Sequence, residues 1–413
     1  MNSAIAATIG LVLAIILIIR KVSPVYALLL GALAGGLLSG WGLQTTVSTM
    51  IDGVKDITPA IVRIISAGVL TGMLVISGAA ERISLSIVKA FGSRQIYLAL
   101  ALSAMLLTAM GVFIDVAIIT IAPIAILAGG KLGLSRGKLL LAMIGGGKCG
   151  NIISPNPNTI IASENFGAPL SSVMAAGIIP ALIGLALTAF VIVPLMPEGQ
   201  KLTPVAETAE DRKLPGFLAS ISGPVVAIAL LGLRPLFGFA VDPLVALPVG
   251  GLVGIIATRS TKKTGECLKY GLGKMSGIAI LLVGTGTIAG IIKASAIKDV
   301  LVALLSGWSA SGVIMAPLAG ALMCAASAST TAGATIASAS FAQTVLGSGV
   351  SAVWGAAMTN AGATVLDHLP HGSFFHATGG SIGMDVKERL RLIPYETAVG
   401  LVLATASVCV YLI

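Results

Sequence analysis

Long apolar segments separated by short polar connections follow one another along the whole chain. Most span about 17–25 residues, the length with which an α-helix crosses the roughly 30 Å hydrocarbon core of a membrane. Their apolar positions are continuous and do not alternate, which argues against the strands of a β-barrel. The pattern therefore predicts an all-α polytopic membrane protein.

The uninterrupted membrane segments are divided between two halves of the chain. We place them at about 3–20, 24–41, 57–80 and 171–196 in the first half, and at about 216–233, 242–258, 277–292 and 391–413 in the second. Residues 197–215 form a long polar stretch between the halves, which we interpret as a linker. Short amphipathic connectors are predicted around Glu81, Arg82 and Lys89, and again from Lys262 to Lys269.

One apolar stretch, residues 96–130, has basic residues at both ends and therefore begins and ends on the same side of the membrane. It forms either two short helices or a re-entrant hairpin. We favour the hairpin, with its turn at Met110–Asp115, because irregular backbone is tolerated at depth where protein or water covers it. Residues 312–346 predict a second hairpin in the other half, with its tip at 327–331.

Two further segments, residues 139–165 and 350–376, are interrupted by helix-breaking sequence. The first interruption covers 145–159 and holds several Gly and two Pro, and the second covers 359–372. Backbone groups freed there need a polar cavity, because lipid cannot satisfy them. Interrupted helices at corresponding positions of two halves indicate the binding site of a transporter.

The same order of elements recurs at an offset of roughly 210–220 residues. Each half crosses the membrane five times, so the second half begins on the opposite side. We therefore expect an inverted repeat of two five-helix halves, residues 1–196 and 216–413, each with one re-entrant hairpin and one broken helix.

Charge supports this topology. The chain of 413 residues is 56% hydrophobic and 10% charged, with a formal charge of +9. Nineteen of the 25 Lys and Arg fall in loops on one side, four on the other and two, Arg63 and Lys148, inside membrane segments. By the positive-inside rule the linker is cytoplasmic and both termini lie outside. Topology thus explains the basic balance without a nucleic-acid partner.

Charged residues at membrane depth are candidates for chemistry. Lys148, in the first break, is either a counter-charge for an anionic substrate or one member of an ion pair with Asp115 or Asp367. Asp115, Asp367 and His371 are the candidate proton carriers, since a desolvated carboxyl or an imidazole can titrate near neutral pH. His368 and His376 complete the set of three histidines. No metal-ligand spacing and no disulfide framework is present, and we expect no metal site.

Neutral polar side chains gather at the two breaks and at the second tip. Hydroxyl and amide groups suit a hydroxylated carboxylate, and half-helix N-termini favour the carboxylate itself. The alternative role for each is to cap a broken helix. The candidate substrate-binding residues, together with Lys148, are Asn151, Ser154, Asn156, Asn158, Thr159, Ser329, Thr330, Thr331, Asn360 and Thr364.

The chain resembles the gluconate permease (GntP) family of the ion transporter superfamily. The resemblance rests on Asn360–His371, especially Leu366–Gly372, on Gly147–Thr159, and on the paired hairpin and broken-helix order. It implies a proton-coupled importer of gluconate or hydroxybutyrate-type acids in the bacterial inner membrane. It also implies a scaffold domain that often forms a homodimer and a transport domain that moves as an elevator. Asn158-Thr159 resembles the Ser-Asn-Thr signature of sodium–dicarboxylate relatives, but Pro157 stands in place of the Ser.

We therefore predict a secondary transporter that imports a small organic acid by H⁺ symport. The transport domain would comprise about 96–165 and 312–376, and the scaffold about 1–80, 171–292 and 391–413. A Na⁺-coupled citrate or dicarboxylate transporter and a Na⁺/H⁺ antiporter remain alternatives. An enzyme is not predicted, because neither a nucleophile–base pair nor a metal motif is recognisable. The predicted partners are the organic anion, membrane lipid and a second copy of the chain, with H⁺ or Na⁺ as coupling ion.

Overall fold

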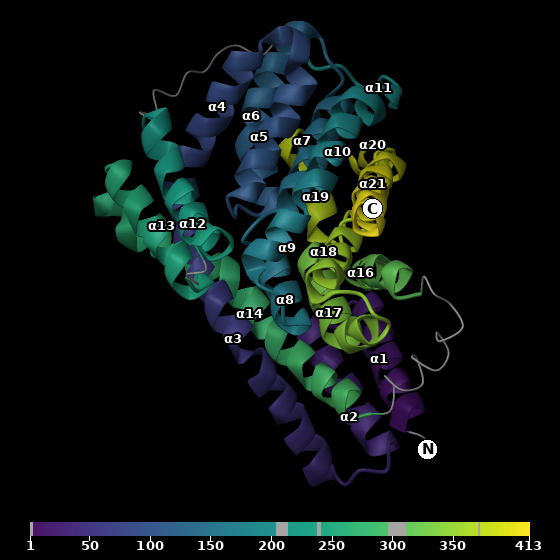
Figure 1. Cartoon of the computed structure of the whole chain (residues 1–413). Helices are drawn as coiled ribbons and strands as arrows, with labels where there is room; N and C mark the ends of the chain where they lie inside the picture. The colour runs from purple at the N-terminus through teal and green to yellow at the C-terminus, as the bar shows by residue number, and fades with distance from the viewer. Residues whose placement is uncertain (1–2, 204–213, 238–240, 296–310, 371) are drawn as a thin grey trace.

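The computed structural model describes residues 3–203, 214–237, 241–295, 311–370 and 372–413. Within these ranges the chain is helical and forms no strand (Figure 1). The first half contains α1 (Ser3–Ile19), α2 (Pro24–Leu38), α3 (Leu43–Ile76), α4 (Ala79–Phe91), α5 (Ile96–Ala109), α6 (Ile114–Leu132), α7 (Arg136–Asn151), α8 (Pro157–Phe166), α9 (Leu170–Ala176), α10 (Ile178–Leu187), the π-helical turn η2 (Thr188–Ile192) and α11 (Val193–Leu195).

The second half also contains long helices, a helix pair joined by a short turn and an interrupted helix. It contains α12 (Phe217–Phe237), α13 (Pro243–Ala257), α14 (Thr264–Ala294), α16 (Ser311–Ser327), α17 (Thr330–Gly347), α18 (Ala352–Gly362), α19 (Ser373–Ser381), α20 (Val386–Leu390) and α21 (Ile393–Leu412). Two 3₁₀ turns, Ser93–Gln95 and Thr261–Lys263, precede α5 and α14.

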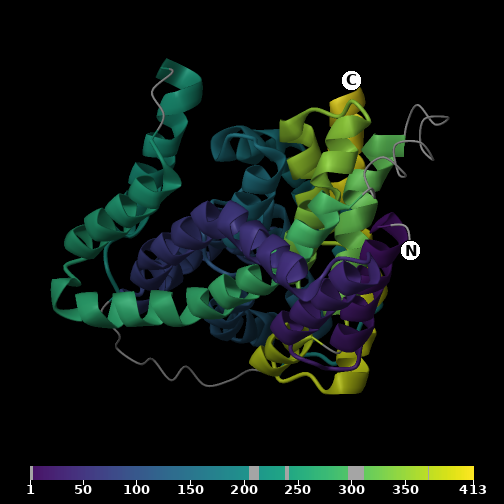
Figure 2. The ribbon, with the colours of Figure 1, turned by 90° about the horizontal axis from the view of Figure 1, so that it is seen from below.

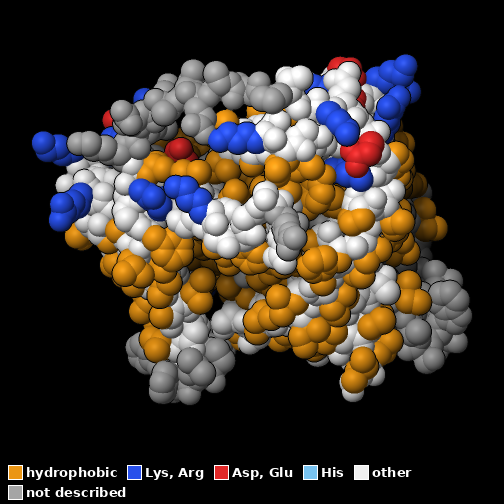
Figure 3. Space-filling view, turned by 90° about the horizontal axis from the view of Figure 1, so that it is seen from above, with side chains coloured by type: hydrophobic (Ala, Val, Ile, Leu, Met, Phe, Trp, Pro, Cys, Tyr) orange, Lys and Arg blue, Asp and Glu red, His pale blue; other side chains and the backbone are white. Residues whose placement is uncertain are grey.

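Several helices are long and apolar enough to cross a membrane. Within the described residues these spans are Leu43–Ile76, Ile114–Leu132, Leu170–Leu195, Thr261–Ala294 and Val386–Leu412. Large hydrophobic side chains are exposed on most of them, as expected of helices that face lipid. Figure 3 shows Lys, Arg, Asp and Glu over the upper half of the view, whereas hydrophobic side chains are abundant below them. The prediction of a helical integral membrane protein is confirmed.

Two helices extend well beyond their apolar segments. α3 begins at Leu43, although its membrane segment was predicted to begin at position 57. α14 begins at Thr264, although its segment was predicted to begin at position 277. In both, the polar residues before the apolar segment are already helical, and α3 continues through Pro59. The predicted connector at Lys262–Lys269 is therefore wrong: most of it is the start of α14. The connector near Glu81 is a separate helix, α4, with one buried face.

α3 and α14 lie side by side along most of their length (Figures 1 and 2). Their contact depends on glycine. A Cβ atom at Gly72 would lie 1.9 Å from the carbonyl oxygen of Cys267, and one at Gly53 would lie 2.1 Å from that of Gly286. Small residues of this kind let two membrane helices approach at the backbone. We call this contact the α3–α14 seam; α2 and α13 also pack on it.

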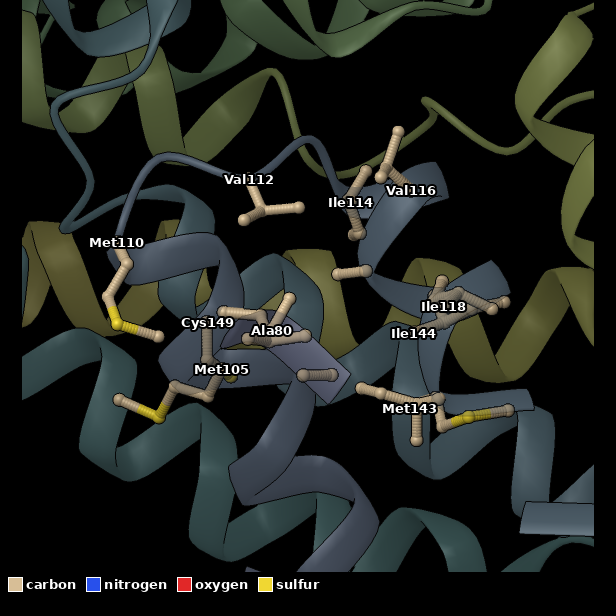
Figure 4. Packing of buried hydrophobic residues seen from close by; sticks show 14 of the residues in the cluster. Ala80, Met105, Met110, Val112, Ile114, Val116, Ile118, Met143, Ile144 and Cys149 are labelled. Carbon is tan, nitrogen blue, oxygen red and sulfur yellow. The ribbon is translucent and has the colours of Figure 1, made fainter. Parts of the chain in front are cut away.

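The first predicted hairpin is a pair of helices, α5 and α6, joined by a short turn at 110–113. Gly111 has φ +95°, a backbone conformation that favours glycine. Apolar side chains hold the turn against α7 and α4. Figure 4 shows this cluster, with Met110 and Val112 from the turn, Ile114 from α6 and Cys149 from α7. The second predicted hairpin is likewise a pair, α16 and α17, joined by two residues.

The first interruption is shorter than predicted. α7 runs through the glycines to Asn151, and the non-helical residues are 152–156. The glycines serve close packing: a Cβ at Gly146 would lie 1.8 Å from the carbonyl oxygen of Ala101 on α5. Pro157, at the first position of α8, begins the second half-helix. In the second half, α18 ends at Gly362 and the break extends to the start of α19.

Candidate functional site

A cavity of about 330 Å³ lies where the two helix-pair turns and the second break meet. It is also bounded by the part of α14 that carries Lys274, Gly277, Ile278 and Leu281. The lining residues are Phe113, Ile114, Asp115, Lys274, Gly277, Ile278, Leu281, Ala328, Ser329, Thr330, Thr331, Asp367, Ser373 and Phe374. Five predicted site residues are thus brought together: Asp115, Ser329, Thr330, Thr331 and Asp367.

Three helices direct their N-termini to this cavity. The first residues of α6, α17 and α19 are all among its lining residues. Each N-terminus carries unpaired backbone N–H groups and a partial positive charge of about half a unit. At α17 the Ser329 side chain caps the helix and accepts from the backbone N–H of Ala332 at 3.3 Å. The cavity is therefore suited to an anion.

Asp115 and Lys274 bring opposite charges to the cavity. Both side chains are only partly buried, and neither forms an ion pair with another residue in the described part of the chain. The Nζ atom of Lys274 lies 5.8 Å from the ring centre of Tyr270, one turn earlier on α14. Both charges are consequently open to a ligand or to water.

Lys148 forms a buried ion pair with Asp367. Its Nζ lies 2.7 Å from Asp367 Oδ1, and the two side chains are 0% and 2% exposed. Lys148 also donates to the carbonyl oxygens of Thr364, at 2.5 Å, and Glu396, at 3.3 Å. The other carboxylate oxygen of Asp367 accepts from the hydroxyl of Thr330 at 2.8 Å. Of the two partners predicted for Lys148, the structure shows Asp367.

His368 extends this network towards α21. Its Nε2 lies 3.1 Å from the carbonyl oxygen of Ile393, which can only accept, so Nε2 carries a hydrogen. In the neutral ring Nδ1 is then free to accept from Lys148, 3.1 Å away. The same Nδ1 lies 3.9 Å from the carboxylate of Glu396, which pairs with buried Arg389. A continuous line of buried charged and polar groups therefore joins α7, the second break and α21.

The amide side chains of the first break bond mainly to one another. Asn156 caps α8, accepting from the backbone N–H of Thr159 at 3.1 Å, and donates to Asn151 Oδ1 at 2.5 Å. Asn360 donates to the Thr159 hydroxyl at 3.1 Å, which links the two breaks. A separate contact links the first break to the second tip: Asn158 accepts from the Thr331 hydroxyl at 2.7 Å.

The remaining predicted site residues are not among the residues that line the cavity. Ser154 Oγ and Asn360 Oδ1 are buried and have no hydrogen-bond partner in the described structure. The Thr364 hydroxyl donates to the carbonyl oxygen of Ala361 within its own helix end. His371 lies outside the described residues. No group of three His, Cys, Asp or Glu suited to a metal is found in the described ranges.

An ion cluster joins the α3–α14 seam to the broken helices. Arg63 on α3 pairs with Glu164 on α8 at 2.5 Å and with Asp242, before α13, at 2.6 Å. Arg63 donates to both carboxylate oxygens of Asp242, from Nε to Oδ1 at 3.0 Å and from Nη2 to Oδ2 at 2.6 Å. Nearby, the Thr71 hydroxyl donates to the carbonyl oxygen of Gly111 in the α5–α6 turn at 2.9 Å.

Sequence reasoning missed four residues of this region: Lys274, His368 as a contact of Lys148, Glu396 and Arg389. Lys274 was assigned to a cytoplasmic loop because it precedes the apolar segment of its helix. The signal that could have found it is the helical spacing from Lys274 to Gly277, Ile278 and Leu281, which all line the cavity.

Comparison with known proteins gives a consistent picture. The family model described as GntP family permease matches residues 3–413. An uncharacterized transporter of Haemophilus influenzae is 53% identical over 99% of this chain and 98% of that protein. A gluconate permease of Pseudomonas aeruginosa is 26% identical over 56% of this chain and 53% of that protein. Among solved structures, the YdaH transporter of Alcanivorax borkumensis has a similar fold, with a TM-score of 0.65 and 15% identity over 90% of this chain and 88% of that one.

Proposed function

The chain belongs to the GntP permease family, and from this premise we propose that it imports a small hydroxylated monocarboxylate, such as gluconate, by H⁺ symport. The observation that carries the proposal is the cavity at which the N-termini of α6, α17 and α19 meet. Those helix ends favour a carboxylate, and the hydroxyls of Ser329, Thr330 and Thr331 offer hydrogen bonds to the hydroxyl groups of the substrate.

The charges around the cavity favour a substrate with one negative charge. Lys148 balances Asp367, and Lys274 balances Asp115 while that carboxylate is ionised. Protonation of Asp115 would leave one positive charge in excess, in addition to the helix ends. A proton on Asp115 would therefore promote binding of one carboxylate, and the carboxylate would promote protonation to the same extent. This reciprocal effect is a physical basis for symport.

The arrangement of helices supports an elevator mechanism within an inverted repeat. The hairpins and broken helices would carry the substrate past the α3–α14 seam, which would be part of the fixed scaffold. The buried network of Lys148, His368 and Glu396 ties α21 to the broken helices, and α10 packs between α7 and α21. We therefore extend the moving unit to α10 and α21. A homodimer in the bacterial inner membrane, with both termini outside, completes the proposal.

The test is uptake by the purified protein in proteoliposomes, preceded by a thermal-shift screen. The acids are gluconate, 3-hydroxybutyrate, lactate, glycerate and citrate, each with and without Na⁺, at about pH 5.5 and about pH 8. We expect one monocarboxylate to stabilise the protein more at the lower pH, with no effect of Na⁺. The same acid should accumulate against its gradient when protons flow inward.

Other outcomes identify the alternatives. Stabilisation by citrate alone, or only when Na⁺ is present, would favour a Na⁺-coupled dicarboxylate transporter. Proton movement driven by Na⁺ without any acid would favour a Na⁺/H⁺ antiporter. Downhill flux without accumulation would contradict symport and favour a passive channel.

A further inference from the structure

Lys274 lines the cavity and forms no ion pair with a carboxylate of the described chain, although Asp115 also lines the cavity. The other lysine near the cavity, Lys148, is fully buried and pairs with Asp367. An anion that enters the cavity would thus meet Lys274 as the ammonium group still open to it. The ring of Tyr270, at 5.8 Å, supports the cation without removing its capacity to donate.

Lys274 belongs to a different part of the molecule from most other polar groups of the cavity. Ser329, Thr330 and Asp367 belong to the second tip and the second break, whereas Lys274 is on α14. The seam fixes α14 to α3 close to this lysine. Gly271 lies three residues before Lys274, and a Cβ at Gly271 would lie 2.0 Å from the carbonyl oxygen of Gly68 on α3. Backbones packed this closely cannot slide past each other without a clash. Lys274 therefore stays with the seam when the tips move.

We propose that Lys274 binds the substrate carboxylate at one end of the transport cycle and not at the other. This inference rests on the proposed function and adds the residue that makes substrate affinity depend on the membrane side. Lys274 lies in the first third of α14, the end assigned to the cytoplasm. Lys274 would strengthen substrate binding while the cavity lies near the cytoplasmic end of α14. Once the tips carry the cavity outward, the contact between Lys274 and the substrate would be broken.

The experiment compares Lys274→Met with Lys269→Met, a control on the same helix whose side chain is exposed and does not line the cavity. The half-saturating concentration of the monocarboxylate that the unmodified protein transports, whether gluconate, 3-hydroxybutyrate, lactate or glycerate, is measured in right-side-out and inside-out membrane vesicles. In inside-out vesicles we expect Lys274→Met to raise the half-saturating concentration roughly 10- to 100-fold, which is the effect of losing one charge-assisted hydrogen bond. In right-side-out vesicles it should change less than about threefold.

Lys274→Arg keeps the positive charge and should retain most of the affinity, which separates loss of charge from loss of folding. Lys269→Met should leave both orientations unchanged. An unchanged half-saturating concentration in Lys274→Met would show that Lys274 does not contact the substrate. Equal weakening from both faces would show that Lys274 moves with the tips, which overturns the dependence on side. If the unmodified protein transports none of the monocarboxylates of the screen, the proposed function itself fails, and this inference fails with it.

Discussion

At the scale of single residues, Lys148 forms the buried ion pair that was one of the two roles the sequence left open for it. Lys148 is fully buried, and Asp367 is both its partner and a lining residue of the cavity. Two charges without water are tolerated only when each is matched by charge and by hydrogen bonds. Thr330, His368 and two backbone carbonyls supply those bonds. The pair therefore holds the second break in place at the edge of the cavity.

We predict that Lys148→Met destabilises the protein by about 3–5 kcal/mol, because Asp367 would remain buried without its counter-charge. Unfolding in detergent, followed by denaturant or heat, measures the effect. Lys55→Met is the control, since the Lys55–Asp52 pair is 72% and 62% exposed and such pairs contribute at most about 1 kcal/mol. Equal stability of Lys148→Met and the unmodified protein would mean that the pair is not a structural element.

Asp115→Asn should separate transport from the proton gradient. The substitution keeps the shape of the side chain but removes the group that would be protonated, so we expect acceleration of uptake by a proton gradient to fall about tenfold or more. Exchange of labelled for unlabelled substrate needs no net proton movement and should persist. Asp56→Asn, at an exposed pair with Lys293, should leave both activities intact. Proton-driven accumulation by Asp115→Asn would contradict the assignment.

The predicted site residues that line the cavity are those for which one element supplied the whole signal, and their roles in binding stay predictions. Ser329, Thr330 and Thr331 follow one another at a tip, and Asp367 lies inside a break, so hydropathy alone located them. Lys274 was missed because a helix can begin before its apolar segment does. Contacts such as His368 with Thr397, at 3.0 Å, depend on how α21 packs, and no local pattern records that packing.

At the scale of elements, glycine determines how closely α5, α7, α3 and α14 approach. The sequence predicted the positions of both breaks but assigned the glycines of 145–150 to the first of them. In the structure these glycines are helical, and a Cβ at Gly150 would lie 2.0 Å from the carbonyl oxygen of Met105. A glycine that allows close packing and a glycine that ends a helix look alike in a sequence, because both lack a side chain. Only the neighbouring helix distinguishes them.

Gly146→Ala should therefore destabilise the protein even though alanine is the better helix former. The added Cβ would lie 1.8 Å from a backbone oxygen of α5, so the helices must separate, at a cost of about 1–3 kcal/mol. Gly273→Ala on α14 is the matched control, because nothing lies within 4 Å of its added Cβ, and it should be neutral or stabilising. Thermal denaturation of both variants measures the difference, and similar melting temperatures would contradict the packing argument.

At the scale of the whole molecule, Arg63 connects parts that the proposed mechanism moves apart. Its partner Glu164 is on a broken helix, whereas Asp242 precedes α13, which packs on the seam. The pair with Glu164, whose side chains are 22% and 32% exposed, would have to open in every cycle. Its strength then biases the molecule towards the arrangement seen here. The sequence identified Arg63 as a charge at depth, but partners that lie 101 and 179 residues away in the chain cannot be read from it.

Glu164→Gln should shift the population of arrangements, and Asp242→Asn should not. Loss of a partly exposed ion pair is worth about 1 kcal/mol, roughly a fivefold change in a two-state equilibrium. Distances between spin labels on α3 and α8, measured in detergent and in lipid, would report the shift. Identical distance distributions in both variants and in the unmodified protein would exclude Glu164 as a restraint on movement.

The α3–α14 seam also has a consequence for how the protein is made. Gly72 and Cys267, which meet across it, are separated by 195 residues (267 − 72). At a synthesis rate of about 5–20 residues per second, about 10 to 40 seconds pass between the synthesis of Gly72 on α3 and that of Cys267 on α14, which covers its glycine face. During that interval the face must be shielded by lipid, by the insertion machinery or by earlier helices. Because α3 belongs to the first half and α14 to the second, the seam can form only after most of both halves has been synthesised.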